Sequence, residues 1–291
     1  MNWIAVDWGT TRLRAWLMDG ASLVESAASD DGMAGLERSA FEPALLSLIG
    51  PWLDRANDVV ACGMVGARQG WVEAPYRAVP CNAAAADLIV APTSDPRMTV
   101  SIAPGVSQAS PPDVMRGEET QIAGFLMDME KFDGVICLPG THTKWAHISA
   151  SEIVSFRTFM TGEFFALIAE HSVLRHDIGD GWDEAAFLEA VDEAMSRPEA
   201  LANRLFTLRA TSLLEGLSPD AARSRASGLL IGMELAAARP YWLGRDVAIL
   251  GDGPQSAAYE AALRAQGAPV TTASAEAATL RGLIALYSAR S

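Results

Sequence analysis

Short apolar runs that suit buried strands alternate along the chain with apolar residues at helical spacing. Strands are predicted at residues 4–7, 13–18, 22–27, 59–62, 134–138, 145–149, 153–156, 247–250 and 269–272. Helices are predicted at residues 41–49, from 118 onwards, 164–174, 185–195, from 198 onwards, 221–238, 254–266 and 275–289. This alternation favours an α/β architecture, in which helices cover sheets.

One strand-turn pattern occurs twice, about half a chain apart. The strand at residues 4–7 leads into a Gly-Thr turn, and the strand at 134–138 leads into another. Each turn is followed by a strand, a second turn and a further strand. The repeat predicts two duplicated domains that face each other. We place them at residues 1–131 and 132–291, with the last helix, at about 275–290, packing back on the first domain.

The first turn carries an acid, a glycine and two hydroxyls at a strand end. Asp7 ends the apolar run, and Gly9, Thr10, Thr11 and Arg12 follow. An unpaired buried carboxylate would be costly, whereas an exposed turn offers N–H groups and hydroxyls to phosphate and a carboxylate to Mg²⁺. We predict that Asp7 binds the metal and that the turn binds phosphate. An ordinary hairpin is the alternative.

The second turn has a similar composition. It contains the candidate phosphate ligands Gly140, Thr141, His142, Thr143 and Lys144. We assign His142 a phosphate contact and no catalytic role, because a histidine in a turn is often only a local hydrogen-bonding group. Lys144 also fits a solvated strand residue.

A pair of acids begins the helix at residue 118. Glu118 and Glu119 follow Arg116 and Gly117. Acids in a first helical turn often only complement the helix dipole. The other interpretation makes one of them a general base, with Arg116 as a cation for a substrate carboxylate. Adjacent helical side chains diverge by about 100°, so only one of the pair is expected to be the base.

Three further segments carry candidate binding residues. Gly66, Gly70 and Trp71 belong to a glycine-rich loop after the strand at 59–62, which suits a small polar ligand but also fits a strained loop without function. Arg157 is a second cation for a carboxylate or phosphate, and Thr161 is placed to cap the next helix. Glycines at the end of the strand at 247–250 suit an adenine ring, although a plain strand-turn-helix junction is equally compatible; these are Gly251 and Gly253.

Composition excludes several classes of protein. The 291 residues carry a net charge of −14 without a lysine or arginine run, so nucleic-acid binding is not expected. An anionic substrate must then be held by a few local cations and backbone donors. Cys62, Cys81 and Cys137 lack metal-binding spacing, which favours a reducing cytoplasm. Neither a signal peptide nor a membrane-spanning segment is expected.

These motifs together resemble the 2-dehydro-3-deoxygalactonokinase family. The resemblance is carried by residues 7–16, 63–66, 70–71, 75–76, 115–121, 139–145, 156–163 and 227–232. It implies two ribonuclease-H-like domains of the actin, hexokinase and heat-shock ATPase type, with a nucleotide cleft between them. It also implies ATP and Mg²⁺, and phosphorylation of the 6-hydroxyl of 2-dehydro-3-deoxy-D-galactonate.

The superfamily pattern carries over residue by residue. It implies phosphate and metal contacts at Asp7, Gly9, Thr10 and Thr11, phosphate contacts at Gly140, Thr141 and Thr143, and adenosine contacts at Gly251 and Gly253. Asp252 interrupts the usual glycine pair. Related sugar kinases place an Asp base in a Gly-Asp-Gln-Gln run, where this chain has Glu118 and Glu119. The choice of base is therefore open, and we rank Glu118 first.

Alternatives remain at the level of function. The sequence does not distinguish the galactonate-derived sugar acid from its gluconate epimer, since the two differ at one stereocentre. A phosphohydrolase of the same fold and a nucleotide-gated binding protein are the other candidates. We expect a cytoplasmic enzyme that binds a sugar acid and ATP, with the oligomeric state open and a homodimer as one option.

Overall fold

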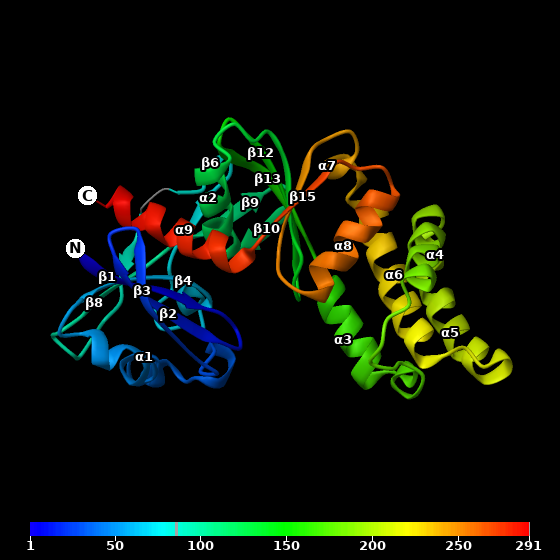
Figure 1. The fold of residues 1–291 in the computed structure, drawn as a ribbon, viewed down its shortest axis with the longest axis horizontal. Helices are drawn as coiled ribbons and strands as arrows, with labels where there is room; N and C mark the ends of the chain where they lie inside the picture. The colour runs from blue at the N-terminus through cyan, green and yellow to red at the C-terminus, as the bar shows by residue number, and fades with distance from the viewer. Residues whose placement is uncertain (85–86, 291) are drawn as a thin grey trace. The chain divides into compact units, whose positions relative to one another are not determined.

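The computed structural model of the protein describes residues 1–84 and 87–290 (Figure 1). The chain forms two compact units. Unit 1 comprises residues 1–133, 148–155 and 274–291, and unit 2 comprises residues 134–147 and 156–273. No helix within residues 1–84 and 87–290 is long and apolar enough to cross a membrane.

Unit 1 is built on a sheet of six strands in the order β3-β2-β1-β4-β8-β7. Strand β1 pairs antiparallel with β2 and parallel with β4, and β4 pairs parallel with β8. A smaller sheet has the order β10-β9-β5. The strands are β1 (Asn2–Trp8), β2 (Leu13–Asp19), β3 (Ser22–Ser29), β4 (Asp58–Gly63), β5 (Tyr76–Ala78), β6 (Cys81–Asn82), β7 (Ile89–Val90), β8 (Thr99–Ile102), β9 (Gly105–Ala109) and β10 (Pro112–Met115).

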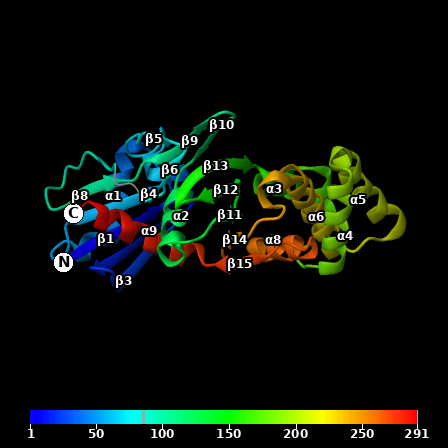
Figure 2. The same ribbon diagram turned by 90° about the horizontal axis from the view of Figure 1, so that it is seen from above.

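Helices cover both faces of the larger sheet of unit 1. Alternate residues of β1 point to opposite faces, so Ile4 packs in one core with α1 (Phe41–Ile49) and Trp3 packs in another with α9 (Ala275–Ala289). Helix α9 also packs closely on α2 (Glu118–Asp128), as Figures 1 and 2 both show. A Cβ at Gly124 would overlap the carbonyl oxygen of Ala278, so this contact requires glycine.

Unit 2 is built on the strands β11 (Gly134–Leu138), β12 (Thr143–Ser149), β13 (Glu152–Phe159), β14 (Val247–Leu250) and β15 (Val270–Ala273). Their order is β15-β14-β11-β12-β13, and β11, β14 and β15 run parallel. The hairpin residues 148–155 count with unit 1, where Ile153 of β13 pairs with Cys81 of β6.

The helices of unit 2 pack on each other as well as on the sheet. They are α3 (Thr161–His171), α4 (Glu184–Ser196), α5 (Leu201–Glu215), α6 (Pro219–Ala237), α7 (Arg239–Trp242) and α8 (Pro254–Ala265). Both views show α4, α5 and α6 side by side (Figures 1 and 2). Gly228 and Gly232 of α6 lie against the backbone of α4. A Cβ at Gly228 would come too close to the carbonyl oxygen of Phe187, and a Cβ at Gly232 too close to that of Val191.

The predicted α/β fold and its internal repeat are confirmed. The order β3-β2-β1-β4-β8 in unit 1 corresponds to β13-β12-β11-β14-β15 in unit 2. One predicted helix, at residues 164–174, is displaced. Helix α3 begins at Thr161 and ends at His171, and a separate 3₁₀ turn (Val173–His176) follows. Ser172 separates the two because its hydroxyl accepts the N–H of Leu174 at 3.0 Å.

Candidate active site

The first Gly-Thr turn joins β1 to β2 and exposes its polar side chains. The N–H of Gly9 donates to the carbonyl of Arg12 at 2.9 Å, and residues 33–34 donate to the carbonyls of Gly9 and Thr10 at 3.0 Å. The side chains of Thr10, Thr11 and Arg12 are exposed. The turn is therefore fixed by its backbone, and its hydroxyls and cation remain accessible to an anionic ligand.

Asp7 is held in place by a residue that the sequence analysis did not assign. Arg14, which faces Asp7 across the β1–β2 pair, donates to Oδ2 of Asp7 from Nε at 3.2 Å and from Nη2 at 2.5 Å. The thiol of Cys62 lies 3.8 Å from the other carboxylate oxygen, Oδ1. The antiparallel pairing of β1 with β2 could have predicted this contact, because it places Arg14 directly opposite Asp7.

Glycines bring the predicted acid pair close to Asp7. Gly63, at the end of β4, has φ of 90°, and a Cβ there would lie 3.3 Å from Oδ1 of Asp7. Gly117, with φ of 108°, precedes α2, and its Cβ would lie 3.3 Å from the Cα of Gly63. Asp7 and the start of α2 thus both lie close to Gly63, although they are far apart in sequence.

The two acids have different environments. Glu119 is 2% exposed, and both its carboxylate oxygens accept the N–H of Gly117, at 2.9 and 2.8 Å. Burial raises the pKa of Glu119 to about 7, the neighbouring Glu118 carboxylate acts in the same direction, and the Gly117 hydrogen bond opposes both. Glu118 is only partly buried, and its Oε2 accepts the N–H of Arg116 at 3.0 Å. Each acid thus accepts a backbone N–H from the residue two positions before it, and the two differ in burial.

Arg116 is buried beside this helix start. Its Nη2 donates to the carbonyl of Ala74 at 2.8 Å, and its guanidinium lies 4.3 Å from the ring centroid of Tyr76. Among the described residues, Nε and Nη1 of Arg116 have no hydrogen-bond partner. A Cβ at Gly66 would lie 2.9 Å from Nη1, so glycine leaves the space that the guanidinium occupies.

The other two candidate residues of the glycine-rich loop, Gly70 and Trp71, make contacts that stabilise the fold. Gly70 is in close contact with the backbone of Val65, and its carbonyl accepts Nε of Arg38 at 3.2 Å. Trp71 is 5% exposed and packs in the core against Trp8 and Phe41. The structure therefore places Gly66 beside Arg116, and Trp71 beneath the loop.

The second Gly-Thr turn lies between β11 and β12 and is braced by α3. The N–H of Glu163 donates to the carbonyl of Thr141 at 3.0 Å, and a Cβ at Gly162 would overlap the carbonyl of Gly140. The side chain of His142 is exposed, and its Nε2 lies 2.6 Å from Oε2 of Glu163. The start of α3 thus supports the turn.

Two predicted ligands of this turn are buried. The hydroxyl of Thr143 is 2.9 Å from that of Tyr259 on α8, and Thr143 is fully buried. Lys144 is 5% exposed, and its Nζ donates to the carbonyl of His142 at 3.3 Å. Thr143 therefore links the turn to the interior, and Lys144 lies close under its backbone.

Thr161 is the first residue of α3, and Arg157 lies before it on β13. The cap position of α3 is Met160, so the predicted capping role of Thr161 is wrong. The hydroxyl of Thr161 instead donates to the carboxylate of Glu234, because the buried acceptor lies within reach of it. Arg157 is exposed on β13.

The glycines predicted to contact adenosine lie between β14 and α8. A Cβ at Gly251 would overlap the hydroxyl of Ser256, and Gly253 has φ of 82°. Gln255, in the first turn of α8, donates to the carbonyl of Gly140 at 2.9 Å. The start of α8 is thus connected directly to the second Gly-Thr turn.

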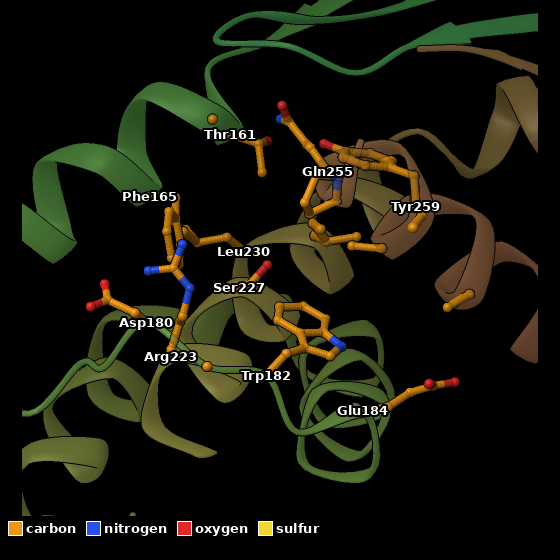
Figure 3. Close-up of a pocket in the computed structure, with 17 residues that line it drawn as sticks. Thr161, Phe165, Asp180, Trp182, Glu184, Arg223, Ser227, Leu230, Gln255 and Tyr259 are labelled. Atoms are coloured by element: carbon orange, nitrogen blue, oxygen red, sulfur yellow. The ribbon is translucent and has the colours of Figure 1, made fainter. Parts of the chain in front are cut away.

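A cavity of about 680 Å³ lies within unit 2, beside the start of α8. Figure 3 shows Gln255 and Tyr259 on one side of it and Phe165, Arg223 and Trp182 on the other. The Arg223 guanidinium lies 5.1 Å from the ring centroid of Phe165. The sequence analysis missed this cavity, because its walls come from α3, α6, α8 and the segment before α4, which no local pattern connects.

Within the described ranges, no group of three or more histidine, cysteine, aspartate or glutamate residues is arranged to hold a metal ion. Mg²⁺ bound through a nucleotide needs only one or two carboxylates from the protein. Oδ1 of Asp7, which lies 3.8 Å from the Cys62 thiol and is not the oxygen that binds Arg14, has the chemistry for such a contact.

The protein has an α/β fold that matches actin-like ATPase structures. A ligand-bound xylulose kinase from Lactobacillus acidophilus matches this fold with a TM-score of 0.52 and 9% identity, covering 99% of this chain and 89% of that chain. The family model described as 2-keto-3-deoxy-galactonokinase matches residues 7–286. The chain therefore belongs to the 2-keto-3-deoxy-galactonokinase family, a family of ATP-binding kinases.

Three similar proteins carry names that match this family. "Probable 2-dehydro-3-deoxygalactonokinase DgoK1" of Rhizobium meliloti (strain 1021) is 38% identical over 97% of this chain and 95% of its own length. The 2-dehydro-3-deoxygalactonokinase of Escherichia coli (strain K12) is 34% identical over 97% of this chain and 96% of its own. The crystal structure of "a putative 2-dehydro-3-deoxygalactonokinase protein from Sinorhizobium meliloti" matches with a TM-score of 0.93 and 36% identity, covering 99% of both chains.

Proposed function

We propose that the protein transfers the terminal phosphoryl group of ATP to the 6-hydroxyl of 2-dehydro-3-deoxy-D-galactonate, with Mg²⁺. The observation that carries the proposal is the family match over residues 7–286, which includes every segment assigned to the site. The free thiols Cys62, Cys81 and Cys137 are compatible with a cytoplasmic location.

Unit 1 supplies the groups for the acceptor. Arg116 binds the carboxylate of the sugar acid, because Nε and Nη1 of its guanidinium have no hydrogen-bond partner among the described residues. Glu118 is the general base for the 6-hydroxyl, since its side chain is partly exposed whereas that of Glu119 is buried. Arg157 is the second candidate for the substrate carboxylate.

Unit 2 supplies most of the groups for the nucleotide. The cavity beside the start of α8, the helix that Gly251 and Gly253 precede, takes the nucleoside, and the turn at residues 140–144 takes phosphate. The volume of about 680 Å³ lies in the usual range for small-molecule sites. The turn at residues 9–12 provides further phosphate contacts from unit 1.

The chemistry required of these residues is orientation and charge neutralisation. Phosphoryl transfer has a loose transition state, in which charge on the transferred group must be stabilised and the acceptor hydroxyl must be aligned. Lys144 and Arg12 are cations for the phosphates, and Glu118 orients the hydroxyl and receives its proton. Mg²⁺, held by Asp7, would neutralise phosphate charge when bound.

A kinetic screen tests the proposal. Purified protein is assayed with Mg-ATP and a panel of 2-keto-3-deoxy sugar acids, and ADP formation is measured with and without each acid. We expect turnover to require a sugar acid, with the galactonate-derived acid giving the highest kcat/KM. A higher kcat/KM for the gluconate epimer would make that acid the assigned substrate. ATP hydrolysis without any acid would indicate a phosphohydrolase. ATP binding without turnover would indicate a binding protein.

A further inference from the structure

Unit 2 contains a fully buried carboxylate that joins several elements of the nucleotide site. Glu234 on α6 is 0% exposed. Its Oε1 accepts the indole N–H of Trp145 at 2.7 Å, and its Oε2 accepts the hydroxyl of Tyr259 at 2.7 Å and that of Thr161. These donors come from β12, α8 and α3, so one carboxylate connects three elements to α6.

Each of these elements carries residues assigned to ATP. Trp145 directly follows Lys144, and Thr161 begins the helix that braces the turn at residues 140–142. Tyr259 lies on α8, which follows Gly251 and Gly253. Thr161 and Tyr259 also line the cavity (Figure 3).

When Glu234 is ionised, the direction of each hydrogen bond to it is fixed, because a carboxylate can only accept. Tyr259 has a single hydroxyl proton, which it donates to Glu234, so Thr143 must donate its own proton to the Tyr259 oxygen, 2.9 Å away. A proton on Glu234 would face hydroxyls that already donate, and one of them would have to turn away. The ionised carboxylate therefore sets the orientation of Thr143 at the phosphate turn.

Stability alone does not account for a carboxylate here. Replacing a buried charge by an apolar group of similar volume is often neutral or stabilising. Burial raises the pKa of Glu234 to about 7, against the hydrogen bonds from Thr161, Trp145 and Tyr259. The titratable groups that face it are Tyr259 from α8 and Cys137 from β11, and burial raises the pKa of both well above their usual values, so they stay neutral near pH 7.

We propose that ionised Glu234 is a positioning residue for the nucleotide. It holds the second Gly-Thr turn through Trp145 and Thr143, and it holds two walls of the cavity through Thr161 and Tyr259. The proposal rests on the proposed function, because it takes the turn and the cavity as the ATP site.

The first test is Glu234→Gln, which keeps the size of the side chain. The amide NH₂ would meet hydroxyls that now donate, so the Thr143–Tyr259 chain must reverse or break. We expect the KM for ATP to rise about tenfold, as for the loss of one or two hydrogen bonds, with the KM for the sugar acid unchanged. Trp145→Phe, which removes one donor and does not line the cavity, should act in the same direction with a smaller effect.

A matched control separates positioning from general destabilisation. Asp177 is another buried carboxylate of unit 2; it pairs with Arg209 at 2.7 Å and does not line the cavity. Asp177→Asn should lower the melting temperature and leave the KM for ATP unchanged. If Glu234→Gln does not fold, Trp145→Phe and Thr143→Val carry the same test.

The second readout is the pH dependence of nucleotide affinity, measured by calorimetry with a non-hydrolysable ATP analogue. The ratio of wild-type to Glu234→Gln affinity should be near one at pH 5.5 and about tenfold at pH 8.5, because only ionised Glu234 orients the donors. Ionisation of the terminal phosphate, with a pKa of about 6, affects both proteins and cancels in the ratio.

Two results would overturn the proposal: an affinity ratio that does not change with pH, or equal rises in the KM for ATP and for the sugar acid. Either would make Glu234 a purely structural residue. The proposed function fails separately, if the wild-type protein binds the ATP analogue but phosphorylates no sugar acid. In that event the binding measurements still decide the role of Glu234.

Discussion

Both carboxylate oxygens of Glu119 accept the backbone N–H of Gly117, at 2.9 and 2.8 Å. This pairing holds the helix start at Gly117, whose φ of 108° strongly favours glycine. Glu118 makes a similar contact to the N–H of Arg116 at 3.0 Å, but its side chain stays partly exposed. This difference in exposure supports Glu118 as the general base.

Glu118→Gln should lower kcat by about 10²–10⁴-fold, the usual range for a positioned acid–base group, with nearly unchanged ATP binding. Steady-state kinetics and calorimetry measure the two effects. Glu119→Gln is the internal comparison and should reduce stability more than turnover. If Glu119→Gln abolishes turnover while Glu118→Gln stays active, the base is Glu119; if both stay active, the pair only begins the helix.

Stability should fall as pH rises from 5 to 8, because of Glu119 and Glu234. Burial raises the pKa of each to about 7, so the folded state binds protons more tightly than the unfolded state, where the pKa is near 4.5. Their favourable contribution is therefore complete below about pH 4.5 and is lost as pH rises through about 7. Each carboxyl group should account for about 2–3 kcal/mol of this change.

Urea unfolding of the wild type, Glu119→Gln and Glu234→Gln at several pH values measures this effect. Each glutamine variant should show a flatter pH profile, since an amide does not titrate in this range. Identical slopes for variant and wild type would show that these two groups do not change protonation on folding.

Arg116→Met should raise the KM for the sugar acid far more than the KM for ATP. The expected loss is about 1.5–3 kcal/mol of binding, as for charge-assisted hydrogen bonds to a carboxylate. Gly66→Ala offers an independent test, because its Cβ would lie 2.9 Å from Nη1 and displace the guanidinium. Arg157→Met is the comparison variant. Equal changes in both constants would exclude Arg116 as the carboxylate ligand.

Asp7→Asn should lose most turnover at ordinary Mg²⁺ concentrations while the protein stays folded, because an amide removes a ligand charge from the metal. The salt bridge to Arg14 complicates this variant, so Arg14→Met is the matched control. Arg14→Met should change the Mg²⁺ dependence of turnover much less than Asp7→Asn. Near-normal turnover of Asp7→Asn at ordinary Mg²⁺ concentrations would contradict the metal role.

Ser227→Leu should fill part of the cavity without touching the phosphate turn. Ser227 lines the cavity and is only partly buried. We expect the KM for ATP to rise at least tenfold, with the KM for the sugar acid and the melting temperature little changed. Fluorescence of Trp182, which is 47% exposed beside the cavity, should respond to nucleotide in the wild type. A KM for ATP that does not change would place the nucleoside elsewhere.

The sequence by itself determined the local structure and the kind of chemistry. Apolar runs and helical spacing located β1–β4, β11–β15 and the longer helices, because burial of one face produces a periodic residue pattern. The short strands β5–β10 were not located, because they are too short to show a period. The repeated Gly-Thr turns predicted the duplicated topology, which the strand order confirms. The motif set also resembles the family, and the family match over residues 7–286 confirms that resemblance.

Only the tertiary structure decided which side chains meet. Helix periodicity could not show which of Glu118 and Glu119 faces the interior, because that depends on how α2 packs. The Arg14–Asp7 pair depends on strand register, and the cavity and the Glu234 hydrogen bonds depend on segments that are distant along the chain. Contacts of this kind form when separate elements pack together, so no local pattern in the sequence specifies them.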